Sequence, residues 1–246
     1  LSVSEKAWKA EGSRMFLDPK RPATVEDLLK GVIVQSGNDA CIALAEGVAG
    51  SEESFVAVMN QMAKKLGMTH THFMNVTGLP HPQHTTTARD LSRLAGALIR
   101  DFPDFYKYYA MKSFAYNGIS QPNRNRLLFM DPSVDGVKTG HTESAGYCLI
   151  ASAKREQRRL LSVVLGAGSD GARAMESQKL LNYGFQFFET VKLYPANQAV
   201  SSLRIYKGKG GEVKAGFLSD FHVTVPRGMS KNIQAQLVTQ QPLLAP

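Results

Sequence analysis

Three adjacent residues, Lys138, Thr139 and Gly140, combine a positive charge, a hydroxyl group and an unobstructed backbone. They lie in the polar stretch Val134–Thr142, which precedes two apolar runs of strand length. At the edge of a sheet the lysine and the threonine can bind a carboxylate or another anion, and the glycine lets the ligand approach the backbone. The alternative is an ordinary solvated strand edge, because a tripeptide alone is a weak signal.

A second polar triplet, Ser36-Gly37-Asn38, interrupts two segments of helical periodicity. Residues 24–27 resemble a capping box in which Asp27 replaces the usual Glu or Gln, and they start a helix whose apolar face extends to Ile33. The next helix follows the triplet directly and ends at Gly50. A polar triplet between mostly apolar helices indicates side chains that work in a cleft. The alternative is an interhelical turn in which Asn38 caps the second helix.

Four of the six histidines fall between residues 68 and 86: His70, His72, His81 and His84. No pair has the spacing of a zincin helix and no carboxylate lies among them, so we interpret this segment as a Gly/Pro-rich loop and predict no metal. Cys41 and Cys148 lie in apolar contexts without CxxC spacing, which favours two buried thiols. We therefore expect no cofactor.

The bulk composition excludes other classes of protein. With 246 residues, of which 43% are hydrophobic and 20% charged, the chain can bury a substantial core. It contains no run of eighteen or more apolar residues that could span a membrane. The net charge is +8, but Lys and Arg are scattered, which favours anionic small ligands or an anionic surface over nucleic acid.

The remaining elements place the two triplets on a framework of mixed type. Residues 1–23 are predicted to be polar and irregular, and Asn117-Gly118 predicts a hairpin. Further helices are expected from Ser51 or Ser54 to Gly67, from Thr87 to a point before Pro103, and over residues 171–190. Strands at 147–153 and 160–165 should form a hairpin that continues the sheet of the Lys-Thr-Gly strand.

The pattern of apolar residues changes after Val191, where short runs of alternating apolar and polar residues replace helical periodicity. These runs, at 202–206, 221–225 and 233–238, predict a separate small β domain over residues 191–246, which is short for a self-standing sandwich. The predicted fold class is α+β. We expect an antiparallel sheet flanked by helices over residues 1–190, truncated at its N-terminus, followed by an incomplete all-β C-terminal domain.

Taken together, the two triplets resemble the motifs of the D-alanyl-D-alanine carboxypeptidases, the low-molecular-mass penicillin-binding proteins of the serine β-lactamase and transpeptidase superfamily. Lys138 follows Ser36 by about a hundred residues. The resemblance extends over most of the chain and includes residues 24–40, 117–119, 123–125, 134–147, 161–166, 185–190 and 225–228.

This resemblance implies a serine acyl-transfer enzyme that trims the terminal D-Ala from peptidoglycan stem peptides and is acylated by β-lactams. It implies catalytic roles for Ser36 in proton relay, for Asn38 at the substrate amide and for Lys138 as electrostatic support. It implies that the substrate is bound by Thr139, Gly140, His141, Arg173 and Arg124. The alternatives are that Arg173 is a charge on a helix surface and that His141 is an exposed loop residue.

One part of the family pattern is missing. The nucleophile and base come from an S-x-x-K motif, and none of the serines of this sequence has a lysine three positions later. In the family this motif lies upstream of Ser-Gly-Asn. We expect the chain to be a fragment of a longer enzyme; the alternatives are one piece of a cleaved molecule or a protein that lost catalysis.

Two other functions stay open. The first is a serine β-lactamase, against which stand the lack of a Glu-x-x-x-Asn deacylation motif and the C-terminal β domain. The second is a non-catalytic peptidoglycan-binding protein. The resemblance also implies an extracytoplasmic, periplasmic location at the inner membrane, with stem peptides ending in D-Ala-D-Ala, β-lactams and the membrane surface as partners.

Overall fold

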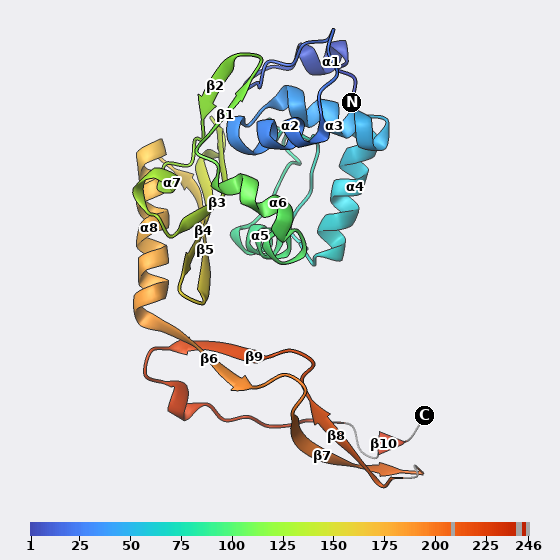
Figure 1. Cartoon of the computed structure of the whole chain (residues 1–246), viewed down its shortest axis with the longest axis vertical. Helices are drawn as coiled ribbons and strands as arrows, with labels where there is room; N and C mark the ends of the chain where they lie inside the picture. The colour runs from blue at the N-terminus through green and yellow to red at the C-terminus, as the bar shows by residue number, and fades with distance from the viewer. Residues whose placement is uncertain (208–209, 240–242, 245–246) are drawn as a thin grey trace. The chain divides into compact units, whose positions relative to one another are not determined.

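The computed structural model describes residues 1–207, 210–239 and 243–244, and its contacts divide the chain into two compact units, Leu1–Leu181 and Asn182–Pro246 (Figure 1). The first unit combines helices with an antiparallel sheet, and the second is built of strands. The predicted α+β class, with an antiparallel sheet flanked by helices and a β unit after it, is confirmed.

The first twenty-three residues are more ordered than the sequence predicted. They contain the short helix α1 (Glu5–Trp8), whose first turn is capped by the Ser4 hydroxyl at 3.0 Å from the Ala7 amide. Several of their apolar side chains are buried in the main core: Val3, Ala7, Ala10, Met15, Leu17 and Ala23. Outside α1 the segment is irregular, as predicted, but its description as polar missed these core residues, because they lack a regular spacing and still meet the helices that follow.

The helices that follow start where their capping residues predicted. The Thr24 hydroxyl accepts the Asp27 amide at 3.0 Å and begins α2 (Val25–Lys30), which continues as a π-helical turn, η1 (Gly31–Gln35). Next come α3 (Asn38–Ala49), α4 (Glu52–Lys65) and α5 (Ala88–Asp101), the last two capped by Ser51 and Thr87. The helix expected to begin after the Ser-Gly-Asn triplet instead includes Asn38 as its first residue.

The histidine-rich segment between α4 and α5 is a loop fixed by a bridge between His72 and Thr85. His84 packs edge-on against Phe73, and burial lowers the pKa of its imidazole. Within the described parts of the chain, no group of three or more His, Cys, Asp or Glu side chains is placed to hold a metal ion.

After α5 the chain forms the short helices α6 (Pro103–Tyr106) and η2 (Lys107–Ala110) and then the hairpin of β1 (Ser113–Tyr116) and β2 (Ile119–Pro122). Asn117 and Gly118 both have positive φ, 46° and 75°, as a type I′ turn requires. A single turn, α7 (Leu127–Met130), leads to the main sheet.

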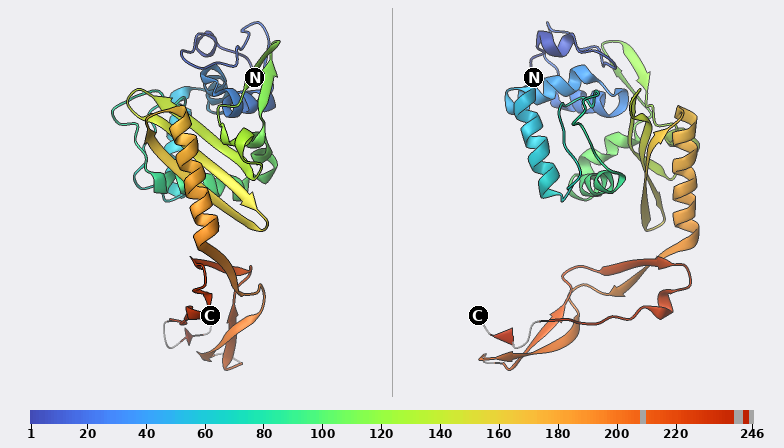
Figure 2. Two further views of the ribbon diagram at one scale, coloured as in Figure 1. Left: turned by 90° about the vertical axis from the view of Figure 1, so that its left-hand side faces the viewer. Right: turned by 180° about the vertical axis from the view of Figure 1, so that it is seen from behind.

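The main sheet consists of β3 (Val134–Thr142), β4 (Gly146–Arg155) and β5 (Arg158–Ala167), paired antiparallel in that order. Helix α8 (Asp170–Phe187) runs across one face of this sheet (Figure 2). Its buried residues Ala174, Ser177 and Leu181 recur every three or four positions and form one stripe. The helix ends at Phe187, short of the predicted Thr190.

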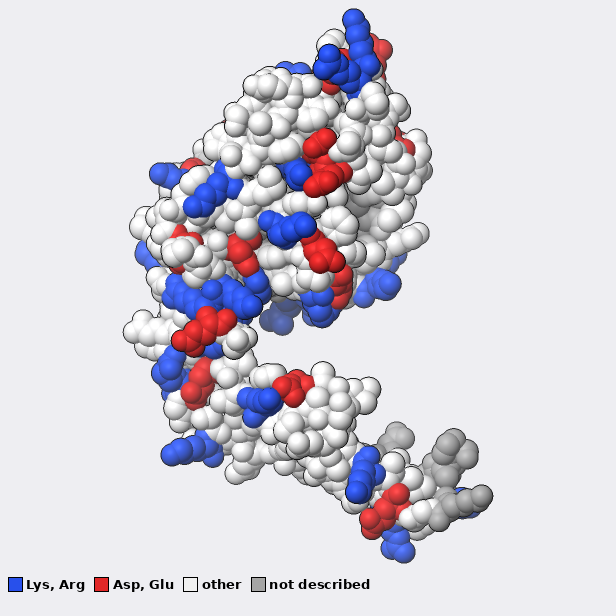
Figure 3. Space-filling model, viewed as in Figure 1, with Lys and Arg blue, Asp and Glu red and all other residues white. Residues whose placement is uncertain are grey.

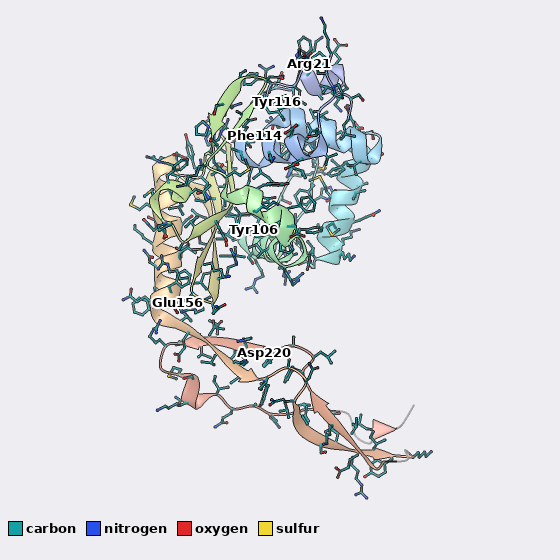
Figure 4. The ribbon with its side chains drawn as sticks, viewed as in Figure 1. Arg21, Tyr106, Phe114, Tyr116, Glu156 and Asp220 are labelled. Carbon is teal, nitrogen blue, oxygen red and sulfur yellow. The ribbon has the colours of Figure 1, made fainter. Side chains whose placement is uncertain are left out.

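A polar cluster fixes the first residues of β3 away from the cleft. The Tyr106 hydroxyl donates to Asp135 at 3.1 Å, and Arg159 forms an ion pair with the same carboxylate at 2.7 Å (Figure 4). Gly136 is required here because a Cβ would lie 2.5 Å from the Tyr106 hydroxyl oxygen. The cluster sets the position of the strand that carries Lys138.

The second unit contains two separate strand groups. Strand β6 (Phe188–Tyr194) pairs antiparallel with β9 (Phe221–Pro226). Strand β7 (Ala199–Tyr206) pairs antiparallel with β8 (Glu212–Gly216) and parallel with β10 (Leu243–Leu244). A single turn, η3 (Ser230–Asn232), follows β9. The strand predicted at 233–238 is wrong, because that segment is irregular and has no ladder partner among the described residues.

Charges of both signs are interspersed on the face of the first unit that Figure 3 presents. In the second unit Lys192 pairs with Asp220 at 2.8 Å (Figure 4). Of the helices within the described residues, none has the length and apolar character needed to span a lipid bilayer.

Candidate active site

A cleft of about 970 Å³ opens in the first unit, between the α3 end of the helical part and the β3 edge of the sheet. Every site residue predicted from the sequence lines it: Ser36, Asn38, Arg124, Lys138, Thr139, Gly140, His141 and Arg173. The structure therefore brings all of them together, although they come from separate parts of the sequence. The role of each residue stays a prediction.

Ser36 enters the cleft at the end of the π-helical turn η1. Its backbone is left-handed, with φ 57° and ψ 40°, which costs a non-glycine residue about 1–2 kcal/mol. The preceding residue, Gln35, is 1% exposed and donates to the Phe114 carbonyl at 3.0 Å, so the turn is fixed against β1. The Ser36 conformation is thus maintained by its surroundings, as is common at functional sites.

Lys138 connects the two triplets. Its Nζ donates to Ser36 Oγ at 3.0 Å and to the Thr139 carbonyl oxygen at 2.9 Å. Burial, with a smaller contribution from the positive charges of Arg124 and Arg173, lowers the pKa of Lys138 to about 8. The ammonium remains the main form at pH 7, but it is poised near the pH at which it loses its proton.

Asn38 and its neighbour Asp39 fix the start of α3. The Asn38 side-chain amide donates to the Glu11 carbonyl at 2.7 Å, and its backbone N–H donates to the Ser13 carbonyl at 2.7 Å. The buried Asp39 carboxylate accepts the backbone N–H groups of Met15 and Leu17 at 2.9 and 3.1 Å. The segment before α2 is thereby tied to the cleft, and no local sequence pattern predicts these long-range bonds.

Thr139, Gly140 and His141 line the cleft along β3. Gly140 pairs with Cys148 and His141 with Tyr147 in the ladder to β4. His141 is exposed, and the centroid of its ring lies 4.0 Å from that of the Tyr147 ring, so the imidazole packs against an aromatic side chain. His141 is therefore a strand residue and not the loop residue that we considered as an alternative.

Arg173 and Arg124 enter the cleft in different ways. Arg173, on α8, is 5% exposed, so the alternative of a surface charge is wrong. Its Nη1 donates to the carbonyl oxygens of Gly140 at 3.0 Å and Cys148 at 3.4 Å. Arg124 is exposed, and its neighbours hold it in place, because Asn123 and Asn125 are buried and donate to the carbonyls of Met111 and Gly136.

Sequence reasoning missed several residues of the cleft: Ser13, Cys41, Leu79, Arg126, Tyr147, Cys148 and Asp170. The two thiols are half-buried and free, not fully buried as predicted, and burial raises the pKa of Cys41 to about 11. Two of these residues could have been found from strand pairing. Cys148 and Tyr147 are the ladder partners of Gly140 and His141, so they lie beside predicted site residues.

A tight turn at residues 75–79 also borders the cleft. The Asn75 side chain accepts the Gly78 N–H at 2.7 Å and donates to the Leu79 carbonyl at 2.9 Å. Gly78 has φ 79°, which favours glycine. The turn presents Leu79, 41% exposed, as an apolar residue in a polar cleft.

Comparison with known proteins then identifies the family. The family model described as D-alanyl-D-alanine carboxypeptidase matches residues 1–169. The chain belongs to the D-alanyl-D-alanine carboxypeptidase family. A second model, described as the C-terminal domain of penicillin-binding protein 5, matches residues 188–246, so both units have counterparts among known proteins.

Curated relatives and solved structures agree with this membership. The chain is 48% identical to D-alanyl-D-alanine carboxypeptidase DacC of Escherichia coli (strain K12), and the alignment covers 99% of this chain and 63% of that protein. Penicillin-binding protein 5 from Haemophilus influenzae is similar in structure, with a TM-score of 0.92 and 42% identity over 100% of this chain and 73% of that one.

A third similar structure shows a ligand complex. Penicillin-binding protein D2 from Listeria monocytogenes, in its cefotaxime-bound form, matches with a TM-score of 0.64 and 33% identity over 75% of this chain and 72% of that chain. The present chain spans 63% of the DacC relative, which is somewhat less than two thirds of its length. What these whole proteins do is therefore applied to this chain only as a proposal.

Proposed function

We propose that the chain is the cleft-bearing part of a serine-type D-Ala-D-Ala carboxypeptidase, which removes the terminal D-Ala from peptidoglycan stem peptides and is acylated by β-lactams. The single observation that carries this proposal is the 3.0 Å hydrogen bond from Lys138 to Ser36, in a cleft that is also lined by Thr139 and three arginines. A hydroxyl, a cation and groups with the chemistry to bind a carboxylate thus lie within one cleft.

The direction of that hydrogen bond supports a proton relay through Ser36. A charged lysine can only donate, so Ser36 Oγ accepts from Lys138 Nζ. The hydroxyl hydrogen of Ser36 is then free to point at another acceptor, such as the nitrogen of the leaving D-Ala. Lys138 also makes the hydroxyl a better proton donor, because its positive charge stabilises the alkoxide character that develops.

Asn38 retains the group needed to orient a peptide. One N–H of its side-chain amide is committed to the Glu11 carbonyl at 2.7 Å. With the amide held in that way, its carbonyl oxygen is positioned to accept the N–H of a substrate peptide group in the cleft.

The cationic end of the cleft suits a substrate that ends in a carboxylate. Thr139 offers a hydroxyl, and Arg124 and Arg173 offer guanidinium groups, which match carboxylates in charge and in geometry. Lys138 adds a further positive charge at the same end. A peptide with an amidated C-terminus should therefore bind less well than one with a free carboxylate.

The nucleophile in this proposal lies outside the 246 residues, on an S-x-x-K motif of the same protein or of a companion chain. Its Oγ would attack the carbonyl carbon of the penultimate D-Ala, and the C–N bond would break as D-Ala leaves with the relayed proton. Water would then hydrolyse the acyl-enzyme and regenerate the serine. The present chain alone would bind and orient substrate without turnover.

The proposal also includes the cellular location of the protein and the identity of its two domains. We place the protein in the periplasm at the surface of the inner membrane, where its +8 charge favours an anionic surface. Residues 1–190 would form the penicillin-binding domain and residues 191–246 the β-rich C-terminal domain. Fractionation of cells with and without a high-salt wash tests the location.

The test of the function uses the full-length product of the gene that contains these residues. We expect release of D-Ala from a D-Ala-D-Ala peptide and a stoichiometric penicillin adduct by mass spectrometry. The matched control replaces the S-x-x-K serine with alanine, which should abolish both. The isolated 246 residues should form no adduct.

Other outcomes separate the alternatives. Rapid hydrolysis of penicillin without release of D-Ala would establish a β-lactamase. A gene without an S-x-x-K motif, with a product that binds peptidoglycan but does not react, would establish a non-catalytic binding protein. A penicillin adduct on the isolated chain would show that the nucleophile is one of its own serines.

A further inference from the structure

Asp170, the first residue of α8, lies between two arginines of the cleft. Its Oδ1 accepts a short hydrogen bond from Arg173 Nη2, and its Oδ2 lies 3.4 Å from Arg126 Nη1. All three side chains line the cleft. No family motif in the sequence pointed to Asp170 or Arg126, and the proposed function does not use them.

The hydrogen bonds of Arg173 are largely used within the protein. A guanidinium group has five N–H bonds. Nη1 donates to the carbonyls of Gly140 and Cys148, and Nη2 donates to Asp170. At most two N–H bonds then remain for a ligand. The carbonyls fix one side of the guanidinium group and Asp170 fixes another, so Asp170 determines which of its edges faces the cleft.

The same carboxylate connects α8 to the segment that carries Arg124. Arg126 is two residues after Arg124, and Asn125 between them is 1% exposed and bonded to the Gly136 carbonyl. Asp170 therefore joins two walls of the cleft that are 44 residues apart in the sequence. Loss of this carboxylate would free Arg126 and the Nη2 side of Arg173 together, while the carbonyls of Gly140 and Cys148 still hold Arg173 Nη1.

The charge of Asp170 argues against a direct role in binding. Among the described residues that line the cleft, it is the only acid, and it lies beside the cations expected to receive a substrate carboxylate. A carboxylate there repels an anionic ligand, so it weakens binding unless it orders the cations that attract the ligand. Its two arginine contacts supply that compensation.

We propose that Asp170 is a positioning residue that holds Arg173 and Arg126 in the orientation in which the cleft receives the terminal carboxylate of the substrate. This inference rests on the proposed function. It predicts that Asp170 affects the binding of the carboxylate more than the chemical step, because it acts through the arginines and does not touch the reacting bond.

The test compares Asp170→Ala and Asp170→Asn in the full-length protein. Asp170→Ala should raise KM for a D-Ala-D-Ala peptide about tenfold with little change in kcat, which is the size of one charge-assisted hydrogen bond. Asp170→Asn keeps a carbonyl oxygen for Arg173 Nη2 and should restore most of the affinity. Glu176→Gln is the matched control, because Glu176 is an exposed acid on the same helix that pairs with Lys179.

A binding measurement makes the test independent of catalysis. Calorimetry with a product peptide ending in one D-Ala should show the same tenfold loss for Asp170→Ala, whereas its C-terminal amide should bind all variants equally. Tighter binding by both variants would mean that Asp170 acts only by repulsion. Equal losses for the peptide and its amide would mean a merely structural role. Either result, or no change in any variant, overturns the inference.

The two proposals fail in different ways. A wild-type protein that releases D-Ala, with Asp170 variants that match it, removes this inference alone. A wild-type protein that neither releases D-Ala nor binds the product peptide removes the proposed function, and the role of Asp170 with it.

Discussion

The two units of the chain are stabilised by different kinds of interaction. In Leu1–Leu181 polar groups such as Gln35, Asp39, Asn125 and Arg173 are buried, and each is hydrogen-bonded to backbone groups distant in sequence. Among the described residues of 182–246, none is buried to this degree, and strand ladders and stacked rings hold the strands together. Buried polar groups that must be satisfied specify a single geometry, and a cleft requires one.

This difference predicts that substitutions in the polar framework of the first unit have large effects and that substitutions in the second have small, local ones. The largest effect should come from Lys138, which carries the one hydrogen bond between the two sequence triplets. In the full-length protein, Lys138→Met should lower kcat/KM for a D-Ala-D-Ala peptide by about 10²-fold or more, through loss of a preorganised cation.

The same substitution should stabilise the fold at neutral pH. The pKa of Lys138 is lowered from 10.5 to about 8, so the unfolded state binds more protons than the folded state between these two values. The charged lysine thus disfavours folding below pH 8, by at most about 3 kcal/mol, and this cost disappears as the pH rises from about 8 to about 10.5.

Thermal unfolding measures this effect directly. Lys138→Met should have the higher Tm at pH 7, and its advantage should shrink at pH 10. A variant that is less stable than the wild type at pH 7 would mean that the hydrogen bonds to Ser36 and Thr139 outweigh the cost of burial. In that case the charged Lys138 side chain would stabilise the folded state at pH 7.

The next largest effect should come from Asp39, which is 1% exposed and accepts three backbone N–H groups, those of Met15, Leu17 and Ala40. Asp39→Ala should lower the free energy of unfolding by about 3–5 kcal/mol, because it leaves buried donors without partners. Asp101→Ala, which removes an exposed acid paired with Arg100, should cost less than about 1 kcal/mol. Urea titration checks both values, and similar costs for the two would contradict the distinction.

These framework residues also mark the limit of what the sequence predicts. The capping residues Thr24, Ser51 and Thr87 and the turn at Asn117 and Gly118 act over a few positions, so they were readable from local chemistry. The cleft residues on β3 were found because a motif named them. Their convergence in one cleft agrees with the geometry that the motif implies.

Contacts between distant segments were not readable. Asp39 bonds to Met15 and Asp170 to Arg126, and no local pattern records either pair. The alternation at 233–238 was misleading for a related reason, because an alternating segment becomes a strand only when a partner strand is available to pair with it. To predict that a side chain such as Cys148 is only half-buried, one needs both the local sequence pattern and the contacts between distant segments.

The smallest effect should come from the second unit, where Phe217 stacks on Tyr194 at 5.5 Å and on Phe221 at 4.5 Å. Phe217→Ala should destabilise β6 and β9 by about 1–2 kcal/mol through loss of ring contacts. Leu218→Ala, at a side chain that is 92% exposed, is the matched control and should change stability by less than about 0.5 kcal/mol. Hydrogen exchange should show faster opening of β6 and β9 only, because local stability follows local contacts. If β3 to β5 lost protection equally, the two units would unfold as one, and the contrast between them would be one of composition and not of stability.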